Sequence, residues 1–600
     1  MQNLALIALF APLLSFALAA CFALRPKNLL IATLCSLLIG LSALSSLYLL
    51  WHDQSFNLTL FEWFMGVNFG FDIDALSLVM MSVVGVVATC VHFYSIFYME
   101  KDEGFNKFFA YLGLFVFSML FLVMSDNFLG LFVGWEGVGL CSWLLIGFWY
   151  HNDKYSFAAN EAFIMNRIAD LGMLLGIFWL YLQVGTLKYE EVFALLQGLD
   201  HGALLLIAAC LFIGAMGKSA QFPLHTWLAD AMAGPTPVSA LIHAATMVTA
   251  GVYLVVRANP LYDLVPEFSY LIALIGAFVA LFAASMALVA RDLKRIIAYS
   301  TLSQLGYMFV AAGLGAYSLA LFHLTTHAFF KSLLFLGAGN VMHAMNDELD
   351  IKKMGGLFSP LKITAIFMSI ASLALAGIYP LSGFFSKDLI LGYAFISFHH
   401  GIFLTLLIAA FMTAFYSFRL LMLVFFTPAR HSAHPHEASK IALLAMSPLL
   451  VLAVIAGFFE HGFFEFIRTK LVLIDAENSL VMILASMASG LGIFLAILAY
   501  GRGWFRESVE QNFFHKLLSN DYFIPHFYHQ ILVAWCVRFC EFVRHFDKRG
   551  LDLCVEKIAT SCLLLSSKII VPNSLNLMLY CLVGGFVILG VLCVLFWGGL

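Results

Sequence analysis

Apolar positions follow one another without polar interruption over long stretches of this chain, and charged residues and prolines separate the stretches. An α-helix needs about 20 such residues to cross the hydrocarbon core of a bilayer. Sixteen stretches meet this length, so the pattern predicts sixteen membrane spans. Their approximate limits are 2–24, 28–51, 74–98, 108–125, 127–149, 161–184, 204–222, 236–256, 268–290, 294–313, 316–340, 362–380, 400–426, 440–459, 480–500 and 576–597, and a short helical piece near 386–396 is assigned to the twelfth span.

Two of the predicted spans contain a proline break beside a lysine. The stretch from Pro223 to Leu228 in the seventh span can be laid over the stretch from Pro380 to Phe385 in the twelfth. Proline interrupts the hydrogen bonds of a helix. The two breaks lie five spans apart, and an odd spacing turns the second copy upside down, as in transporters with inverted repeats. We therefore expect broken helices in spans seven and twelve.

The segment 526–568 does not fit the pattern of a span. It mixes Phe, Leu, Val and Ile with many charged residues, which are too dense for hydrocarbon, while its apolar content is too high for a loop. This composition is typical of an amphipathic helix that lies along a membrane or along other membrane proteins. Gly550 is a candidate bend, and the span 576–597 follows as an anchor. A helical hairpin in the cytoplasm is the alternative.

Composition excludes several classes of protein. Only 11% of the 600 residues are charged and 62% are hydrophobic, whereas soluble domains are near 25% charged. A membrane β-barrel alternates apolar and polar residues, and here the apolar runs are continuous. The net charge of −4 provides no basic patch for nucleic acid. The fold class is therefore an all-α polytopic membrane protein.

The cysteines do not form a recognisable ligand set. There are 11 of them, and no two form a C-x-x-C pair, so the sequence predicts no iron–sulfur, haem or structural zinc site in this chain. The stretch Leu18-Ala19-Ala20-Cys21 resembles a lipoprotein cleavage box, but no Lys or Arg precedes it. A signal peptide needs a positive region there, so we expect residues 2–24 to remain as the first span.

Basic residues are distributed unequally between the two sets of loops. One set carries 13 Lys and Arg residues and the other carries 4. Positive loops stay in the cytoplasm, so the first set is predicted to be cytoplasmic. The first set comprises Arg25, Lys27, Lys101, Lys107, Lys154, Arg291, Lys294, Arg295, Lys352, Lys353, Lys362, Arg430 and Lys440, and the second comprises Lys188, Arg257, Arg468 and Lys470. With sixteen spans, both termini would lie on the periplasmic side.

A few ionisable residues lie inside the predicted spans. They are Glu136, Lys218, Lys331 and the neighbouring pair Lys387 and Asp388. A charge in the middle of a span costs about 2.5–3.5 kcal/mol on insertion scales and is a functional candidate by default. Gly134, beside Glu136, favours close helix packing, so Glu136 is expected to face protein rather than lipid. The alternative is a set of ion pairs that only fix helix packing.

Histidines accompany these charges. His323, His327 and Lys331 follow one another at intervals of four residues, on one face of a helix, and His243 lies in the eighth span. Imidazoles interleaved with lysines and carboxylates can form a proton relay. Two alternatives remain: a metal-binding pair of His323 and His327, for which no third ligand lies nearby in the sequence, or core histidines bonded to Ser or Thr.

These motifs together resemble a known family. The chain is similar to subunit L of bacterial NADH–quinone oxidoreductase, the largest antiporter-like membrane subunit of respiratory complex I, a family that includes mitochondrial NADH dehydrogenase subunit 5. The resemblance covers residues 1–500 strongly and later residues only in layout. The segments that carry it are 134–139 (GWEGVG), 166–170 (NRIAD), 217–228 (GKSAQFPLHTWL), 240–248 (ALIHAATMV), 323–331 (HLTTHAFFK) and 383–388 (GFFSKD).

The resemblance implies roles for individual residues. Glu136 would pair with Lys218, and Arg167 and Asp170 would modulate that pair. A central relay would use His243, His323, His327 and Lys331, and Lys387 and Asp388 would serve the outlet. The implied organisation is three N-terminal spans (1–107), a first repeat of spans four to eight (108–256), a second, inverted repeat of spans nine to thirteen (268–426), spans fourteen and fifteen (440–500), the lateral helix (526–568) and the anchor (576–597).

The implied function is proton translocation coupled to quinone reduction in partner subunits, in a bacterial inner membrane. This chain would hold no cofactor; flavin, iron–sulfur clusters and quinone would belong to the partners, which include neighbouring antiporter-like subunits along the lateral helix. The alternative is the large subunit of a multisubunit cation/proton antiporter, or of a related hydrogenase or inorganic-carbon uptake complex.

Overall fold

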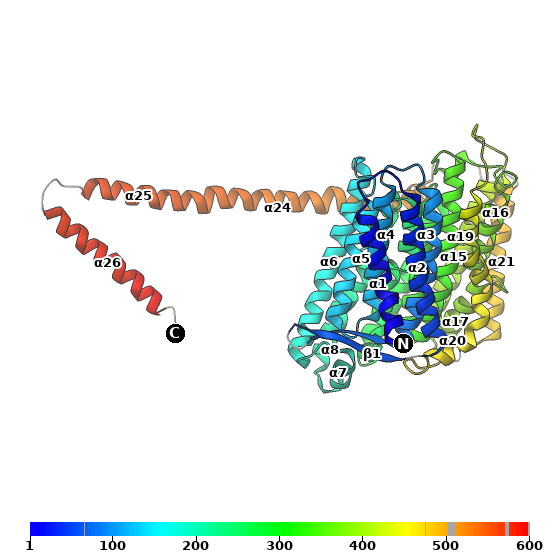
Figure 1. The fold of residues 1–600 in the computed structure, drawn as a ribbon, viewed down its shortest axis with the longest axis horizontal. Helices are drawn as coiled ribbons and strands as arrows, with labels where there is room; N and C mark the ends of the chain where they lie inside the picture. Colours follow the sequence, from blue (N-terminus) through cyan, green and yellow to red (C-terminus); the bar gives the residue numbers. More distant parts are fainter. Residues whose placement is uncertain (54, 65–66, 475, 502–511, 570–574, 598–600) are drawn as a thin grey trace. The chain divides into compact units, whose positions relative to one another are not determined.

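Long helices account for most of the chain. The computed structural model describes residues 1–53, 55–64, 67–474, 476–501, 512–569 and 575–597. The chain divides into two units, Met1–Ser519 and Asn520–Leu600. In the first unit the helices stand side by side as a bundle (Figure 1). Within the described residues, 15 helices are long and apolar enough to cross a membrane, so the predicted polytopic all-α class is confirmed.

The spans of the bundle lie close to the predicted limits. They are α1 (Gln2–Ala20), α2 (Leu29–Trp51), α3 (Ala75–Tyr98), α4 (Phe105–Met124), α5 (Phe128–Ile146), α6 (Asp153–Val184), α8 (His201–Lys218), α10 with α11 (Thr236–Ala244, Met247–Arg257), α13 (Pro266–Val289), α14 (Leu293–Gly313), α15 (Tyr317–Ala344), α18 (His400–Leu421), α19 with α20 (Lys440–Ile455, Glu460–Ile467) and α21 (Ser479–Gly501). A short helix, α7 (Tyr189–Leu195), connects α6 to α8.

Polar residues in the loops fix where several spans begin. The Asn28 side chain accepts a hydrogen bond from the backbone N–H of Leu30 at 3.0 Å, and Asn127 accepts one from Gly130 at 2.7 Å. These side chains satisfy N–H groups that the first turn of a helix leaves without partners. Asn152 caps α6 in the same way. Because of this cap, α6 begins at Asp153, eight residues before the predicted limit.

Three spans are interrupted. α8 ends at Lys218, and the chain resumes a helix only at α9 (Thr226–Asp230), so the expected break at Pro223 is confirmed. The twelfth span is divided into α16 (Lys362–Ala376) and α17 (Ser382–Ile396), so the break at Pro380 and the helical piece near 386–396 are confirmed, with α16 ending four residues before the predicted limit. The eighth span also breaks, between α10 and α11, where the sequence contains no proline.

A β-hairpin was not predicted. Strands β1 (Phe56–Phe64) and β2 (Val67–Ile73) pair antiparallel between α2 and α3. Phe69 and Phe71 of β2 pack on Phe121 of α4, with ring centroids 5.3 and 5.6 Å apart. Apolar residues alternate with polar ones along part of β1, which is the pattern of a half-covered strand. A search for continuous apolar runs does not detect this pattern, so the all-α prediction misses the hairpin.

A buried ion pair holds the end of the hairpin. Arg257, the last residue of α11, donates two hydrogen bonds to the carboxylate of Asp74, at 2.5 and 2.9 Å. Lys470 Nζ lies 3.3 Å from the same carboxylate. Asp74 also accepts a hydrogen bond from the N–H of Ser77 and so caps α3. One carboxylate therefore joins the hairpin, the eighth span and the segment that follows α20.

The second unit contains the predicted amphipathic segment. Helical structure continues from Ile524 to Ile569 through α23 (Ile524–His526), α24 (Val533–Phe546) and α25 (Leu553–Ile569), with wider π-helical turns between them. Gly550, the predicted bend, lies in the π-helical turn Asp547–Asp552. The unit ends with α26 (Leu575–Trp597), which contains the fifteenth candidate span. The helix predicted over 526–568 is thus present, with two local irregularities.

Candidate functional site

The first group of site residues lies where α5, α6 and α8 meet. Glu136 of α5 forms an ion pair with Arg167 of α6, and Lys218 Nζ lies 3.3 Å from Asp170 Oδ2. The Glu136 side chain is 22% exposed, whereas Lys218 is fully buried. Gly134 lets α5 approach α4 closely, since a Cβ there would lie 2.6 Å from the backbone nitrogen of Leu122. Glu136 therefore contacts α6 through Arg167, and its side chain remains partly exposed.

The expected contact between Glu136 and Lys218 is absent from the described residues. The reason is the spacing on α6: Arg167 and Asp170 are three residues apart and therefore point to the same side of the helix. Arg167 takes the carboxylate from α5, and Asp170 takes the ammonium from α8. The structure thus replaces one predicted pair with two pairs that α6 holds next to each other.

Asp170 has a second partner that fixes its orientation. The indole N–H of Trp135 donates a hydrogen bond to Asp170 Oδ1 at 2.6 Å, and the Trp135 ring lies 5.9 Å from Lys218 Nζ. The ammonium also lies against Gly139, where a Cβ would be 2.8 Å from Lys218 Nζ. Because α8 ends at Lys218, the positive charge stands at a helix C-terminus, where it is favourable. The break in the seventh span therefore positions this lysine.

The second group lies on α10 and α15 in the centre of the bundle. His243, His327 and Lys331 are fully buried. Lys331 Nζ donates a hydrogen bond to Ser300 Oγ at 2.6 Å. The His243 ring packs against Phe335 at 5.0 Å, and neither of its ring nitrogens has a hydrogen-bond partner among the described residues. His327 and Lys331 are four residues apart on α15, so their side chains lie on the same face of that helix.

His323 has neutral hydrogen-bond partners. Its ring nitrogens lie 2.9 Å from Ser386 Oγ and 3.2 Å from Gln304 Oε1. Thr326 Oγ1 lies 2.8 Å from the same Ser386 hydroxyl. These contacts match the alternative of a core histidine bonded to Ser or Thr. They also connect His323 to the residue that precedes Lys387, so the two interpretations are compatible.

The third group is the neighbouring pair on α17. Lys387 and Asp388 are 2% and 8% exposed, so both lie in the protein interior. Lys387 Nζ lies 5.2 Å from the centroid of the Tyr307 ring. Neither Lys387 Nζ nor Asp388 Oδ2 has a hydrogen-bond partner within the described ranges.

The three groups are not joined into one continuous chain of hydrogen bonds. Among the residues that the structure describes, no hydrogen bond or ion pair links Lys218 to His243, or Lys331 to His323. Sequence reasoning missed the neutral partners Ser300, Gln304 and Ser386, because hydroxyl and amide side chains are common in membrane helices and carry no charge signal.

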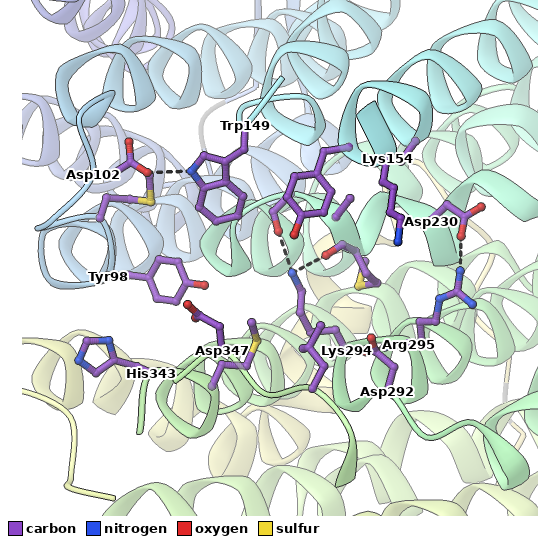
Figure 2. A pocket seen from close by; sticks show the side chains of 18 of the residues that line it. Tyr98, Asp102, Trp149, Lys154, Asp230, Asp292, Lys294, Arg295, His343 and Asp347 are labelled. Atoms are coloured by element: carbon purple, nitrogen blue, oxygen red, sulfur yellow. Dashed lines mark hydrogen bonds and ion pairs between the residues drawn. The ribbon is translucent and has the colours of Figure 1, made fainter. Parts of the chain in front are cut away.

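Sequence reasoning also missed a cavity at one end of the bundle. Figure 2 shows this cavity, which has a volume of about 1290 Å³. Lys294 lies in the wall of the cavity and is buried. Its Nζ donates hydrogen bonds to the carbonyl oxygens of Met232 and Gly234 at 2.6 and 2.7 Å. Arg295 forms an ion pair with Asp230 beside it. The sequence analysis counted Lys294 and Arg295 only as loop charges, because hydrogen bonds to backbone carbonyl groups leave no pattern in the sequence.

Glu161 of α6 lies close to Asp230 of the cavity wall. It lies on α6, six residues before Arg167, and its Oε1 accepts a hydrogen bond from Thr226 Oγ1 at 2.7 Å. The charges of Asp230 and Arg295 act on it. Glu161 stood at the edge of the predicted sixth span and was therefore not distinguished from a loop residue. A series of polar side chains thus runs from the cavity wall to α6.

Comparison with known proteins identifies the family. Residues 125–413 match the membrane region of the NADH:quinone oxidoreductase/Mrp antiporter family, and residues 63–109 match the N-terminus of chain 5 of NADH-ubiquinone oxidoreductase (complex I). The chain is 78% identical to NADH-quinone oxidoreductase subunit L of Campylobacter jejuni over 592 residues, covering 99% of both chains. It is 41% identical to the subunit L of Rickettsia bellii over 579 residues, covering 89% of both.

Two solved structures resemble the chain in fold. A subunit of the Mrp complex from Dietzia sp. superposes with a TM-score of 0.78 at 25% identity, over 94% of this chain and 63% of that one. A subunit of an archaeal membrane-bound sulfane sulfur reductase superposes with a TM-score of 0.70 at 20% identity, over 83% of this chain and 99% of that one. With the geometry of the buried charges and the relatives above, the chain belongs to the subunit L family of NADH-quinone oxidoreductase, the antiporter-like membrane subunit of bacterial respiratory complex I.

Proposed function

We propose that this chain translocates protons across the membrane through its buried ionisable side chains, driven by quinone reduction in partner subunits. The observation that carries the proposal is the presence of three groups of buried Lys, His and Asp side chains within spans of the bundle. Such groups are expensive in a membrane and are retained for function. Side chains that can release a proton are the ones a relay needs.

The interaction energy of the Lys218–Asp170 ion pair is comparable to the work of moving one proton across the membrane. At about 4 Å and an effective dielectric near 20, an ion pair has an interaction energy of ~4 kcal/mol as an upper figure. Moving one proton against about 180 mV costs ~4 kcal/mol. Breaking or making this pair therefore changes the free energy by an amount comparable to the work of pumping. Glu136 and Arg167, which lie beside it on α5 and α6, would modulate its strength.

The entry route would begin at the cavity of Figure 2. From the pair of Asp230 and Arg295, a proton would reach Glu161, which accepts the hydrogen bond from Thr226. Glu161 and Asp170 lie on the same helix, α6, nine residues apart. Bridging water would complete the steps over which side chains do not touch. The route would then reach Lys218 at the end of α8.

The central and outlet steps would use the remaining residues. A proton would pass through His243, Lys331 and His327 to His323, whose partner Ser386 precedes Lys387. Lys387 and Asp388 would release it on the outlet side. This order follows the inverted repeats, spans four to eight and nine to thirteen, which the two broken spans support.

The other parts of the proposal concern the surroundings of the chain. It would hold no redox centre, and flavin, iron–sulfur clusters and quinone would belong to partner subunits. Both termini would lie on the periplasmic side, which the unequal distribution of loop charges supports. The helical segment Ile524–Ile569 would bind along neighbouring antiporter-like subunits. Its mixture of charged and apolar residues supports such a surface-bound position.

A cation/proton antiporter subunit is the second candidate. The superposition on a subunit of the Mrp complex, over 94% of this chain, favours it. Both functions would use the same buried residues, so the geometry of the site does not separate them. The two differ in the partners that accompany the chain and in the source of free energy.

Purification of the native complex from its own membranes tests the proposal. We expect flavin- and iron–sulfur-containing subunits to co-migrate with this chain, and inverted vesicles to acidify during quinone reduction. In a Lys218→Ala strain, quinone reduction should continue while proton uptake per electron falls. A complex without redox subunits that exchanges Na⁺ for protons would contradict the proposal and establish the antiporter function.

A further inference from the structure

Two further cavities meet at the end of the bundle that carries the loops between α1 and α2, α3 and α4, and α5 and α6. The larger has a volume of about 1240 Å³ and the smaller about 210 Å³. Lys107, Phe148 and Tyr150 belong to the walls of both. The two cavities therefore adjoin at these three residues, and we refer to them together as the double cavity.

The larger part of the double cavity is polar and basic. Its wall contains Arg25, Lys101, Lys107 and Lys154 against Asp102, Glu103 and Asp153. Asp102 is already occupied, because it accepts hydrogen bonds from the Trp149 indole N–H and the Gly104 backbone N–H, both at 2.7 Å. The four basic side chains outnumber the three carboxylates by one, so this part of the cavity has a net positive charge and favours an anion.

Lys107 stands at the junction of the two parts. Its Nζ lies 5.0 Å from the Phe148 ring centroid and 5.1 Å from that of Tyr150. Within the described part of the chain, no carboxylate forms an ion pair with this ammonium. It lies in the first turn of α4, whose N-cap residue, Gly104, offers no side chain to the free N–H groups. A helix N-terminus and an uncompensated ammonium together attract a phosphate.

The smaller part of the double cavity continues among α4, α5 and α6. Tyr111, one turn beyond Lys107, lines it together with Trp143 and Leu144. Gly147 and Ala159 form the closely packed floor of this part, since a Cβ on Gly147 would lie only 3.0 Å from that of Ala159. A largely apolar and aromatic groove beside a basic cavity fits the apolar tail and the charged headgroup of a phospholipid. Tyr and Trp are typical of the level of the membrane–water interface, and hydrocarbon chains lie below that level.

We propose that the double cavity is a binding site for an anionic phospholipid, with the phosphate at Lys107 and one acyl chain in the groove lined by Tyr111, Trp143 and Leu144. Negative headgroups are attracted to Lys and Arg near the membrane surface. A helix of a partner subunit would cover the groove but leave the ammonium without an anion. The larger part shares wall residues such as Lys101 and Lys154 with the cavity of Figure 2, but no residue of the proposed relay lines either part, so the proposal does not depend on the relay.

The test uses the whole purified complex in nanodiscs that contain phosphatidylcholine and a small, varied fraction of phosphatidylglycerol. Phosphatidylglycerol that stays bound is counted by native mass spectrometry. Lys107→Gln should weaken its retention roughly fivefold, the effect of one basic residue near the surface. Lys440→Gln is the matched control, because Lys440 is an exposed basic residue at the start of α19 and lies outside both cavities.

Two further arms distinguish the lipid from other ligands. Leu144→Trp fills the groove and should lower retention of diacyl phosphatidylglycerol while the complex stays assembled. Excess inorganic phosphate should not displace the lipid, because phosphate has no acyl chain to occupy the groove. Equal retention in the wild type and in Lys107→Gln, equal retention of phosphatidylcholine, displacement by phosphate, or no effect of Leu144→Trp would each overturn the proposal.

Discussion

At the scale of single residues, Asp170 is the side chain on which two others depend. It accepts hydrogen bonds from Trp135 and from Lys218, and it is 2% exposed. Leaving one member of a buried ion pair without its partner costs about 3–5 kcal/mol. Its neighbour on α6, Arg167, holds Glu136 at a more exposed position. The two pairs should therefore differ in sensitivity to substitution.

Asp170→Asn tests this difference. The amide oxygen can still accept from Trp135, but the negative charge beside Lys218 is lost, so we expect protons pumped per electron to fall at least several-fold. Glu136→Gln leaves the Lys218–Asp170 pair intact and should lower pumping less. The measurement is vesicle acidification divided by quinone reduced. A larger loss in Glu136→Gln than in Asp170→Asn would contradict the pairing seen here.

The carboxylate of Asp74 provides a prediction about pH. Burial alone would raise its pKa, but the neighbouring charge of Arg257, together with its hydrogen bonds, brings the pKa well below the ordinary value. A carboxylate with a lowered pKa stabilises the fold above its unfolded pKa, about 3.9, and this contribution is lost as the pH falls toward the folded value. The stabilisation by Asp74 should therefore be complete at pH 7 and decline below about pH 4.

We expect Asp74→Asn to lower the thermal stability of the subunit at pH 7, because Arg257 would remain buried without its anion. The difference from the wild type should shrink as the pH falls from 5 toward 3. The measurement is the temperature at which this subunit leaves the detergent-solubilised complex on native gels. Glu348→Gln, at an exposed surface ion pair with Lys353, is the control and should have little effect. A difference independent of pH would show that the ion pair is not responsible.

At the scale of elements, the interruption of the eighth span determines where His243 stands. Thr246 Oγ1 donates a hydrogen bond to the carbonyl of Leu241 at 2.7 Å, which draws that carbonyl away from the helical pattern. Threonine hydroxyls compete with the backbone in this way. α10 consequently ends one residue after His243, and α11 begins at Met247. The break keeps His243 at a helix end rather than within a regular helix.

Thr246→Ala should favour a continuous helix through α10 and α11 and reorient His243, so we expect less proton pumping in a complex that still assembles. Thr325→Ala is a matched control, because the Thr325 hydroxyl bonds to the carbonyl of Leu321 within the uninterrupted helix α15. It should pump normally. Assembly is followed on native gels and pumping in inverted vesicles. Normal pumping in Thr246→Ala would show that the break is not needed for function.

The sequence predicts the elements better than their irregularities. Length and apolarity locate the spans, and prolines mark the breaks near Pro223 and Pro380, because both signals are local. The break at Thr246 depends on one hydroxyl and one carbonyl, and the hairpin Phe56–Ile73 alternates in polarity rather than running apolar. Neither feature produces a long-range hydropathy signal.

The site shows the same division between local and tertiary information. Isolated charges in apolar surroundings, such as Glu136 and Lys218, are visible in the sequence because their cost in hydrocarbon makes them rare. Their partners are not visible, since the sequence allows a direct Glu136–Lys218 pair as well as two separate pairs with residues of α6. Only the packing of α5 and α8 against α6 assigns each pair.

At the scale of the whole molecule, the second unit presents a stripe of aromatic residues. Trp535, Phe539, Phe542 and Phe546 of α24 recur at intervals of three or four residues and are all more than half exposed. The rings of Trp535 and Phe539 stack with centroids 5.8 Å apart. Such a stripe lies on one face of a helix. Its burial against a partner would contribute roughly 25 cal/mol for each Å² of apolar surface.

The helical segment Ile524–Ile569 is therefore expected to act mainly as a clamp, because it contains no proton path through the membrane. Truncation after Tyr500 should loosen or remove this subunit from the complex.

A second experiment inserts seven alanines after Gly550, in the π-helical turn Asp547–Asp552. The insertion adds two turns, about 10 Å, and so leaves the helix after the insertion facing nearly the same way relative to the aromatic stripe before it. Wherever that complex assembles, protons pumped per electron should stay near normal, whereas a rod that transmits motion would be disabled by the added length. Assembly and proton stoichiometry are measured in the same membranes. A fully assembled insertion variant that reduces quinone normally but pumps fewer protons would exclude the clamp and indicate a coupling element.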